Sequence, residues 1–556
     1  MARDGKAELI FCPLGGVGEI GMNLALYGYG PADAREWIVV DCGVTFPDES
    51  MPGVDLVLPD IRFIEENLAN LRGIVITHAH EDHYGALLDL WPRLKAKVWM
   101  TPFTAGLLEA KRQSEKGAPE VPVVIYRAGE TFTVGPFAIE AIAVTHSIPE
   151  PVSLAIATPL GTVIHTGDWK IDPGPAIGPL TDEARFRALG DRGVLALMCD
   201  STNALREGES PSEKQVGASL KEVIEAAPAR VAITTFSSNV GRIRSIAEAA
   251  RDAGRRVIVL GRSLKRVIDV AGELGYLDGL PPFLAEEEFG LVPREQLVIL
   301  CTGSQGEPRA ALAKLARDEM RNVSLAAGDT VVYSSRVIPG NEKAILATKN
   351  LLIEQGVKVI EDGDALVHVS GHPRRGELRR MYQWVRPRVL VPVHGEAQHL
   401  VGQGSLAAMS GVPRVAQVRN GDMLRLAPGE PEIVDQVPFG RVYKDGKLIG
   451  SDEEMGIRDR RRLSFAGHVA VNVVLDDRYE IAGDPDLVAI GVARADRSGE
   501  PLEELMLDAA IGAVESIPRV RRKDLDLVEE AVRRAVRSAG EEAWGKKPMV
   551  TVFVTR

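Results

Sequence analysis

THAHEDH, residues 77–83, contains three histidines and an aspartate between His78 and His83. It directly follows GIVI, an apolar run typical of a buried strand, so it lies in the loop at the end of that strand. His78 and His80 are two residues apart, so in extended backbone their side chains point the same way. Asp82 and His83 follow at the turn. Imidazole nitrogens suit borderline metals such as zinc, and a carboxylate adds charge, so the stretch predicts a metal site.

Three further residues with metal-binding side chains lie at comparable strand ends. His146 ends FAIEAIAVTH, Asp168 ends GTVIHTGD and His394 ends RVLVPVH. Because all these residues share this position, we expect them to form one dinuclear site with the histidines and aspartate of THAHEDH. Other histidines lack such a position and are interpreted as structural: these are His165, His399 and His468.

The pattern of apolar residues changes along the chain and predicts several domains. Residues 7–200 contain many short apolar runs separated by Gly, Pro or Asp, typical of strands. From about 205 to 365, long amphipathic helices alternate with single strands, as in a parallel α/β sheet. Strands return at 366–447, so the α/β domain is inserted into the strand-rich one. Residues 448–465 are polar and rich in Arg and Asp, as expected of a linker, and 466–556 form a small α/β unit.

Composition and charge are ordinary for a globular protein. The net charge of -12 over 556 residues argues against a polyanion binder that works by bulk charge. Each of the four cysteines ends an apolar run and none forms a C-x-x-C pair, as expected of reduced, buried thiols. The stretch MARDGKAELIFC predicts no signal peptide, and no apolar run is long enough to span a membrane. We therefore expect a cytoplasmic protein with no membrane association.

A series of motifs in chain order resembles the RNase J family of metallo-β-lactamase/β-CASP ribonucleases. They span residues 13–396 and read PLGGVGEIGMN, DCGVTFPDE, VTHSIPE, HTGDWK, CDSTNA, TGSQGEP, RVIPGNE, HVSGH and PVHGE. The resemblance implies an α/β fold with a metallo-β-lactamase αββα sandwich in two parts, 1–204 and 366–447. Between them would lie a doubly wound β-CASP domain, 205–365. A linker at 448–465 would lead to a small α/β C-terminal domain, 466–556.

The resemblance also implies two divalent ions, with zinc expected and manganese or magnesium as the alternatives. One ion would be held by His78, His80 and His146. The second would be held by Asp82, His83 and His394. Asp168 would bridge the two ions, and Asp41 would support the site from behind. The sequence departs from the family pattern after SGH, where Pro373-Arg374-Arg375 replaces a small residue and an acidic stretch; this puts the start of the following helix and local RNA contacts in doubt.

The chemistry of such a site suits phosphodiester hydrolysis, because two metals activate water at neutral pH and clamp a phosphate. Attack with loss of the 3′-oxygen leaves a phosphate on the 5′ end of the downstream fragment. His372 is the candidate donor of a proton to that oxygen, because histidine exchanges protons near neutral pH. Asp200 would orient His372. Asp82, Asp200 and His372 are therefore the candidate catalytic residues.

A pocket for the 5′-phosphate would make such an enzyme processive from 5′ to 3′. Two Ser-containing segments precede helices, whose free N–H groups bind anions, although ordinary N-capping explains them equally well. The resemblance favours contact with the RNA 5′-phosphate. The candidate residues are Ser237, Ser238, Asn239, His368, Ser370, Gly371 and His372. Phe46 would stack on a base or belong to the core. Solvated helix faces explain most arginines between 374 and 388, and some could line an RNA channel.

These observations predict a 5′-to-3′ exoribonuclease that prefers single-stranded RNA with a 5′-monophosphate and also cuts internally. It would act in mRNA decay and in maturation of rRNA and other RNA 5′ ends, as a homodimer or homotetramer assembled through the C-terminal domain. A DNA nuclease, a thioester or lactam hydrolase and an inactive RNA-binding scaffold are the alternatives. GVGEIG, residues 16–21, matches a dinucleotide-binding pattern but is not followed by a helix.

Overall fold

The computed structural model describes residues 6–338 and 340–556. The start of the N-terminal stretch and Pro339 of RVIPGNE lie outside the described residues. The contacts between residues divide the chain into two compact units. Unit 1 runs to Thr45 and resumes over Val57–Arg441, and unit 2 consists of Phe46–Leu56 and Val442–Arg556. Each unit is described by itself.

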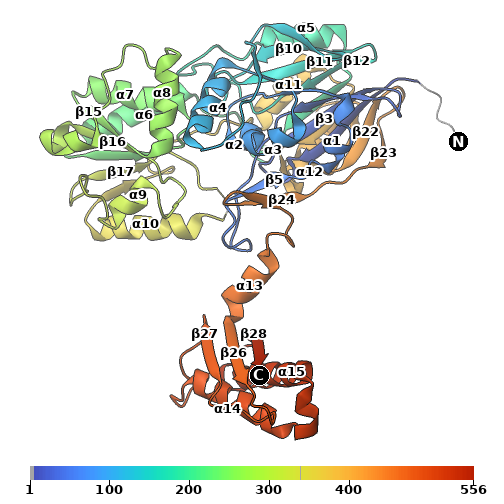
Figure 1. Ribbon diagram of the computed structural model, residues 1–556. Helices are drawn as coiled ribbons and strands as arrows, with labels where there is room; N and C mark the ends of the chain where they lie inside the picture. The colour runs from blue at the N-terminus through green and yellow to red at the C-terminus, as the bar shows by residue number, and fades with distance from the viewer. Residues whose placement is uncertain (1–5, 339) are drawn as a thin grey trace. The chain divides into compact units, whose positions relative to one another are not determined.

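Two mixed sheets form the centre of unit 1 (Figure 1). The first has the order β23 (Glu432–Gln436), β22 (Asp422–Ala427), β1 (Glu8–Gly15), β3 (Leu24–Gly30), β4 (Glu36–Val40), β6 (Leu71–Val75), β7 (Val98–Met100) and β8 (Val123–Ile125). The second has the order β21 (Arg414–Val415), β19 (Val389–Val393), β13 (Ala196–Asp200), β12 (Gly161–His165), β11 (Val152–Thr158), β10 (Phe137–Ala143) and β9 (Thr131–Val134). β22 and β19 come from the part of the chain that follows the inserted domain.

The two sheets pack face to face through alternating apolar side chains. Phe11 and Tyr27 of the first sheet belong to the same buried cluster as Leu154 and Met198 of the second. Helices α5 (Glu183–Arg192), α11 (Arg375–Val385) and α12 (Ala397–Met409) bury a second cluster against the outer face of the second sheet. The helix α1 (Arg62–Glu66) places Phe63 against Trp37 of β4. The four layers confirm the predicted αββα sandwich.

The inserted domain is a parallel sheet covered by helices on both faces. Its strands follow the order β15 (Arg256–Leu260), β16 (Leu297–Cys301), β14 (Val231–Thr234), β17 (Thr330–Tyr333) and β18 (Lys358–Ile360). Its helices are α6 (Glu213–Ala226), α7 (Val240–Asp252), α8 (Arg262–Glu273), α9 (Ala311–Ala316) and α10 (Glu342–Glu354). α6, α7 and α8 lie on one side of the sheet, and α9 and α10 on the other (Figure 1). This is the predicted doubly wound arrangement.

Unit 2 contains a small sheet and two amphipathic helices. The sheet has the order β27 (Asp486–Ile490), β26 (His468–Val474) and β28 (Met549–Thr555). α14 (Leu502–Ser516) and α15 (Leu525–Trp544) bury their apolar sides with one face of this sheet. The segment 448–465, expected to be a linker, contains β25 (Leu448–Gly450) and most of α13 (Ile457–Ala466).

No helix within the described residues is both long enough and apolar enough to cross a membrane.

Candidate active site

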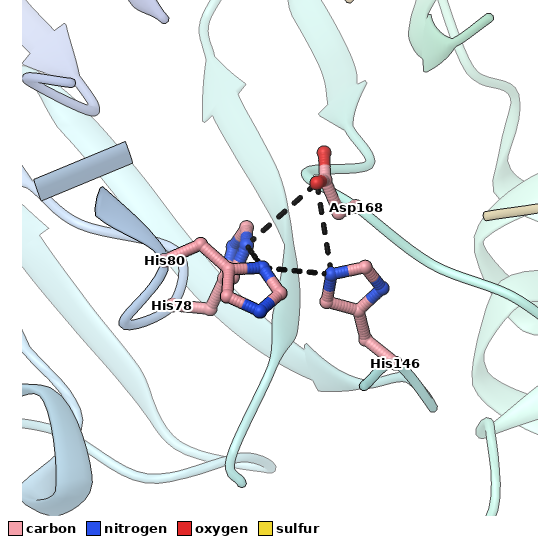
Figure 2. Close-up of side chains that lie close together, drawn as sticks. All are labelled: His78, His80, His146 and Asp168. Atoms are coloured by element: carbon pink, nitrogen blue, oxygen red, sulfur yellow. Dashed lines mark hydrogen bonds and ion pairs between the residues drawn. The ribbon is translucent and has the colours of Figure 1, made fainter. Parts of the chain in front are cut away.

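The THAHEDH stretch begins two residues after β6 ends and leads into the single helical turn α2 (Glu81–Tyr84). Figure 2 shows its first two histidines converging with His146 and Asp168. His80 Nδ1 lies 3.1 Å from His78 Nε2 and 3.0 Å from His146 Nε2. Asp168 Oδ2 lies 3.8 Å from His78 Nε2 and 3.6 Å from His146 Nε2. These four residues form the first cluster, and one ion could bind all of them.

A second cluster shares Asp168 and adds three residues. His83 Nε2 lies 3.3 Å from Asp168 Oδ1 and 3.6 Å from Asp82 Oδ2. His394 Nε2 lies 3.4 Å from Asp168 Oδ2 and 3.8 Å from Asp82 Oδ2. Asp82, His83, Asp168 and His394 therefore form a second group that could hold an ion. The structure brings all seven predicted ligands together, divided as the resemblance implied and joined at Asp168.

Buried acceptors that follow β4 and β6 fix the orientation of two imidazoles. Asp41, at the end of β4, accepts from His83 Nδ1 at 2.7 Å and from the hydroxyl of Thr77 at 3.0 Å. Since the Thr77 hydroxyl has given its hydrogen to Asp41, it can only accept from His78 Nδ1, 3.0 Å away. The neutral forms of His78 and His83 therefore carry their lone pairs on Nε2, and both Nε2 atoms face the centre.

Two more imidazoles are oriented in the same way by carbonyl oxygens. His146 Nδ1 donates to the backbone oxygen of Gly371 at 2.7 Å, and His394 Nδ1 donates to Asn23 Oδ1 at 2.9 Å. Because a carbonyl oxygen only accepts, Nε2 of each ring is left with its lone pair. Such partners on the far nitrogen are usual for histidines that bind metals. Gly371 is required here, because an added Cβ would lie 2.5 Å from the His146 ring.

The donor set fits divalent metal ions. Within the described residues, the buried Asp168 Oδ1 has no hydrogen-bond partner. In the first cluster the lone pairs of His78 and His146 both face His80 Nδ1, which has at most one proton to share. Nitrogen atoms that converge in this way repel one another unless a cation lies between them. Imidazoles with carboxylates suit zinc and other first-row metals.

Burial and charge keep the protein ready to bind such ions. Burial lowers the pKa of His78 and His146 well below the usual range and lowers that of His80 to about 4, so these rings are neutral. Burial also opposes protonation of His83, but the nearby carboxylates of Asp168, Asp82 and Asp41 raise its pKa well above the usual range. A proton must therefore leave His83 when a metal binds.

His372 lies beside both clusters without belonging to either. Its Nδ1 lies 2.7 Å from Oδ2 of Asp200, the last residue of β13 and a fully buried carboxylate. Its ring stacks on His394 with centroids 5.5 Å apart. Burial lowers the pKa of His372, but Asp200 and Asp168 more than offset this and raise it to about 9 in the metal-free protein. Asp200, His372 and His394 also lie close enough to share an ion.

The predicted 5′-phosphate residues lie on two neighbouring segments. Asn239 caps α7 by accepting from the backbone N–H of Arg242 at 2.9 Å, so its side-chain oxygen has a structural partner. The half-buried side chains of Ser237 and Ser238 make no hydrogen bond within the described residues. Arg242 donates to the backbone oxygen of Val367 at 2.9 Å and thereby joins the start of α7 to the segment that contains His368.

His368 and Ser370 differ in their surroundings. His368 Nδ1 is buried and has no partner within the described residues. Burial, followed by the charges of Arg242, Arg336 and Lys170, lowers its pKa well below the usual range. Ser370 accepts from Asn203 Nδ2 at 2.9 Å. Phe46 is 66 % exposed, so it does not belong to the core.

Two residues that hold the site together were missed by the sequence argument. Asn23, in PLGGVGEIGMN, joins the two ends of unit 1: it accepts from His394 and donates to the backbone oxygen of Asp82 at 3.0 Å. The buried carboxylate of Glu377, on α11, accepts from the backbone N–H groups of Ile171 and Arg374, both at 2.8 Å. It thereby joins the loop after Asp168 to the loop after His372. Asn23 could have been singled out because it lies within the motif PLGGVGEIGMN. No signal in the sequence indicated the role of Glu377.

Comparison with known protein families matches four models along the chain. A beta-lactamase superfamily domain matches residues 36–186, and a ribonuclease J beta-CASP domain matches 228–352. A Zn-dependent metallo-hydrolase RNA specificity domain matches 356–413, and a ribonuclease J C-terminal domain matches 455–556. The models follow one another in the order of the domains described above.

Similar proteins cover the chain from end to end. Ribonuclease J of Sinorhizobium meliloti is 65% identical over 100% of this chain and 98% of its own length. Ribonuclease J of Mycolicibacterium smegmatis is 38% identical over 97% of this chain and 96% of its own. Ribonuclease J of Thermus thermophilus is 35% identical over 98% and 94%. A solved structure of a protein of unknown function from Enterococcus faecalis shares the fold, with 16% identity, a TM-score of 0.51 and coverage of 75% of this chain and 100% of its own.

Proposed function

The chain belongs to the ribonuclease J family, and from that premise we propose that it is a 5′-to-3′ exoribonuclease that also cuts internally. The family makes it a metal-dependent ribonuclease, a hydrolase that acts on RNA. The polarity, the preference for a 5′-monophosphate and the internal cuts are our proposal. So are its cellular tasks, mRNA decay and the maturation of rRNA and other RNA 5′ ends. A cytoplasmic location suits its four buried free thiols.

The observation that carries the proposal is the pair formed by His372 and Asp200 beside two ligand clusters that share Asp168. The proposed ligands of the first ion are the first cluster, and those of the second ion are the second cluster. Zinc is the proposed metal, because imidazole nitrogens predominate, and manganese or magnesium are the alternatives. When bound, two such ions supply Lewis acidity that makes water nucleophilic at neutral pH and offsets charge on the phosphate.

The protein's own residues orient the reacting groups. Asp41 and Asn23 hold His83 and His394 with their lone pairs toward the centre. Hydroxide, formed when water loses a proton to solvent, attacks phosphorus in line with the departing 3′-oxygen, and the bond between phosphorus and that oxygen breaks. His372 donates a proton to the 3′-oxygen from Nε2, because its Nδ1–H is held by Asp200. The downstream fragment leaves with a 5′-phosphate, and the upstream nucleotide ends in a 3′-hydroxyl.

The product of each cut determines the proposed direction. Because every cut creates a new 5′-monophosphate, a pocket for this group returns the shortened RNA to the same position. Ser237 and Ser238 are proposed pocket residues whose side chains make no hydrogen bond within the described residues, and His368 is a third, whose Nδ1 has no partner there. Ser370, Gly371 and Asn239 would contribute backbone N–H groups or orient the others. A 5′-triphosphate carries more charge and bulk, so it should be a poorer substrate.

End-labelled RNA tests the proposal. Metal-loaded protein should release labelled mononucleotides first from a 5′-labelled strand, and faster from a 5′-monophosphate than from a 5′-triphosphate. Metal analysis of the purified protein should give two ions per chain. The matching DNA and a thioester should remain intact. If labelled nucleotides appeared first from the 3′ end, the proposed polarity would be wrong; cleavage of DNA at the same rate would remove the preference for RNA.

A further inference from the structure

The arginines that follow His372 fall into two groups. Arg375 lies 2.7 Å from Glu207, Arg380 lies 3.5 Å from Glu209, and Arg386 forms an ion pair with Asp191. These are the ion pairs of ordinary solvated helix faces. Arg374 and Arg388 form no ion pair within the described residues, and Nε of Arg374 is buried without a hydrogen bond.

Two more arginines without acidic partners lie next to Arg374. Arg336 donates from Nη1 to Asn203 Oδ1 at 3.0 Å, and Asn203 Nδ2 donates to the backbone oxygen of His372 at 3.1 Å. Arg206 accepts through its backbone oxygen from the N–H of Arg375 at 2.9 Å. Neither Arg206 nor Arg336 forms an ion pair in the part of the chain that the structure describes. We call Arg206, Arg336 and Arg374 the arginine cluster.

The arginine cluster borders the candidate active site. Asn203, which binds Arg336, also donates to Ser370, a proposed 5′-phosphate residue. Burial and then the charges of Arg206 and Arg374 lower the pKa of Arg336, as expected where like charges are held together. Asp362 acts on Arg336 in the opposite direction but forms no ion pair with it within the described residues, and one carboxylate offsets three adjoining positive charges only in part. An anion from outside the chain would therefore stabilise the cluster.

We propose that Arg206, Arg336 and Arg374 form a second phosphate subsite, which holds an RNA phosphate other than the 5′-monophosphate. This inference rests on the proposed function. Guanidinium groups donate two parallel hydrogen bonds to a phosphate, so a planar group suits this role better than an ammonium. Such a phosphate has two sources in the substrate: the backbone downstream of the cut, or the extra phosphates of a 5′-triphosphate. The departure from the family pattern at Arg374 is then a change in substrate contacts.

Single substitutions to glutamine test the proposal in the full-length chain. Arg336→Gln keeps a donor for Asn203 Oδ1 while it removes the charge, and Arg206→Gln changes an exposed side chain that forms no ion pair within the described residues. Arg374→Gln completes the series. Arg388→Gln is the matched control, because Arg388 is also exposed and without an ion pair among the described residues. It precedes β19, whereas His394 follows it, so the control lies at the opposite end of that strand.

Fluorescence anisotropy in EDTA measures RNA binding without cleavage. Each substitution in the arginine cluster should weaken binding of a 5′-monophosphorylated ten-nucleotide RNA roughly tenfold, as expected for a hydrogen bond to a charged group. The slope of log K against log salt concentration should become shallower by about 0.7 for each phosphate of the single strand that the variant no longer neutralises. Arg388→Gln should change neither quantity.

Two series of RNAs distinguish the sources of the phosphate. Monophosphorylated RNAs of two, three and ten nucleotides should show the effect only above a certain length if the backbone phosphate binds. In the second series, RNAs carry a 5′-hydroxyl, a monophosphate or a triphosphate. If the arginine cluster binds the 5′ end, the variants should weaken binding only of the triphosphate RNA. Either result supports the subsite. If all three variants match Arg388→Gln on every RNA while the wild type cleaves RNA, the subsite is disproved and the proposed function stands; a wild type that cleaves no RNA overturns the proposed function instead.

Discussion

Two groups of buried polar residues in unit 1 differ in how their charges are balanced. In the ligand clusters, the lone pairs of His78, His146 and His394 face Asp168, and Asp168 Oδ1 has no hydrogen-bond partner within the described residues. In the inserted domain, the fully buried Arg242 pairs with Glu213 through two bonds, one of 3.0 Å, and also donates to Ser334 Oγ at 2.6 Å.

The difference separates a site from a structural network. The pair of Arg242 and Glu213 neutralises itself and satisfies its donors, so it needs nothing from outside the chain. In the ligand clusters a proton on His83 balances part of the carboxylate charge, but the remaining lone pairs converge with no cation between them, so the clusters are complete only when metal is bound. Lys170 and Asp172, 2.9 Å apart and buried, belong to the self-neutralised kind although they lie close to Asp168 in the chain. Lone pairs that converge on an unsatisfied carboxylate, more than buried charge itself, therefore mark the functional site.

Replacing the shared carboxylate gives the largest expected effect. Asp168→Ala removes a ligand from both clusters, so cleavage should fall by more than roughly 10³-fold and bound metal should fall below two ions per chain. Rates on 5′-monophosphate RNA and metal analysis are the measurements. Asp435→Ala, which changes an exposed aspartate on β23, is the control and should behave as wild type. Full activity of a metal-free Asp168→Ala protein would refute the site.

His372→Ala should slow the chemical step by roughly 10²–10⁴-fold, the usual contribution of a general acid. Both ions should remain bound, because the ligand clusters do not include His372. Single-turnover kinetics and metal analysis measure the two effects. His468→Ala, in unit 2, removes a histidine that contacts Thr551 at 2.9 Å and should change nothing. Loss of an ion from His372→Ala would instead make His372 a metal ligand, together with Asp200 and His394.

Breaking the structural network of Arg242 and Glu213 should lower the stability of the protein and leave its metal content unchanged. Arg242→Met leaves the Glu213 carboxylate buried without its cation, which should destabilise the inserted domain by about 3–5 kcal/mol. Urea unfolding measures this, and the metal content of the folded protein should stay unchanged. Arg112→Met, which breaks a surface pair with Glu109 on α4 (Pro102–Ser114), should leave the unfolding midpoint unchanged. Loss of metal with unchanged stability in Arg242→Met would erase the distinction between the two groups.

The sequence predicted the parts of this picture that depend on local pattern. His78, His146 and His394 could be found because each follows an apolar strand, and the ends of these strands meet at one edge. The inserted domain followed from alternating helices and strands. Contacts between distant segments could not be predicted: Asn23 lies 371 residues from His394, and no spacing links them. Likewise, polar composition suggested a linker at 448–465, but the helix α13 depends on packing within unit 2.

Unit 2 contains neither a ligand cluster nor a buried, self-neutralised ion pair among its described residues. Changes in unit 2 should therefore have the smallest effect on chemistry. Its described residues form no candidate metal cluster. One face of its sheet packs on α14 and α15. Several large apolar side chains on its strands remain exposed, among them Val488, Ile490 and Phe553. An open sheet of this kind pairs readily with another chain, so we propose that unit 2 assembles the enzyme into dimers or tetramers.

Deleting the chain after Arg458 tests this role of unit 2. The shortened protein should be monomeric and should still bind two ions, because every proposed ligand lies in unit 1. Its activity on short RNA should be close to wild type, and only long RNA, which can bind more than one subunit at once, should be cleaved a few-fold more slowly, roughly the effect of removing one weak second binding site. A full-length chain with Ile490→Asp and Phe553→Asp is a second, milder test. It keeps the core of unit 2 and adds charge only at exposed positions, so it should dissociate as the shortened protein does. Light scattering measures both proteins. If both had the oligomeric state of the wild type, unit 2 would not assemble the enzyme, and its exposed apolar residues would need another explanation.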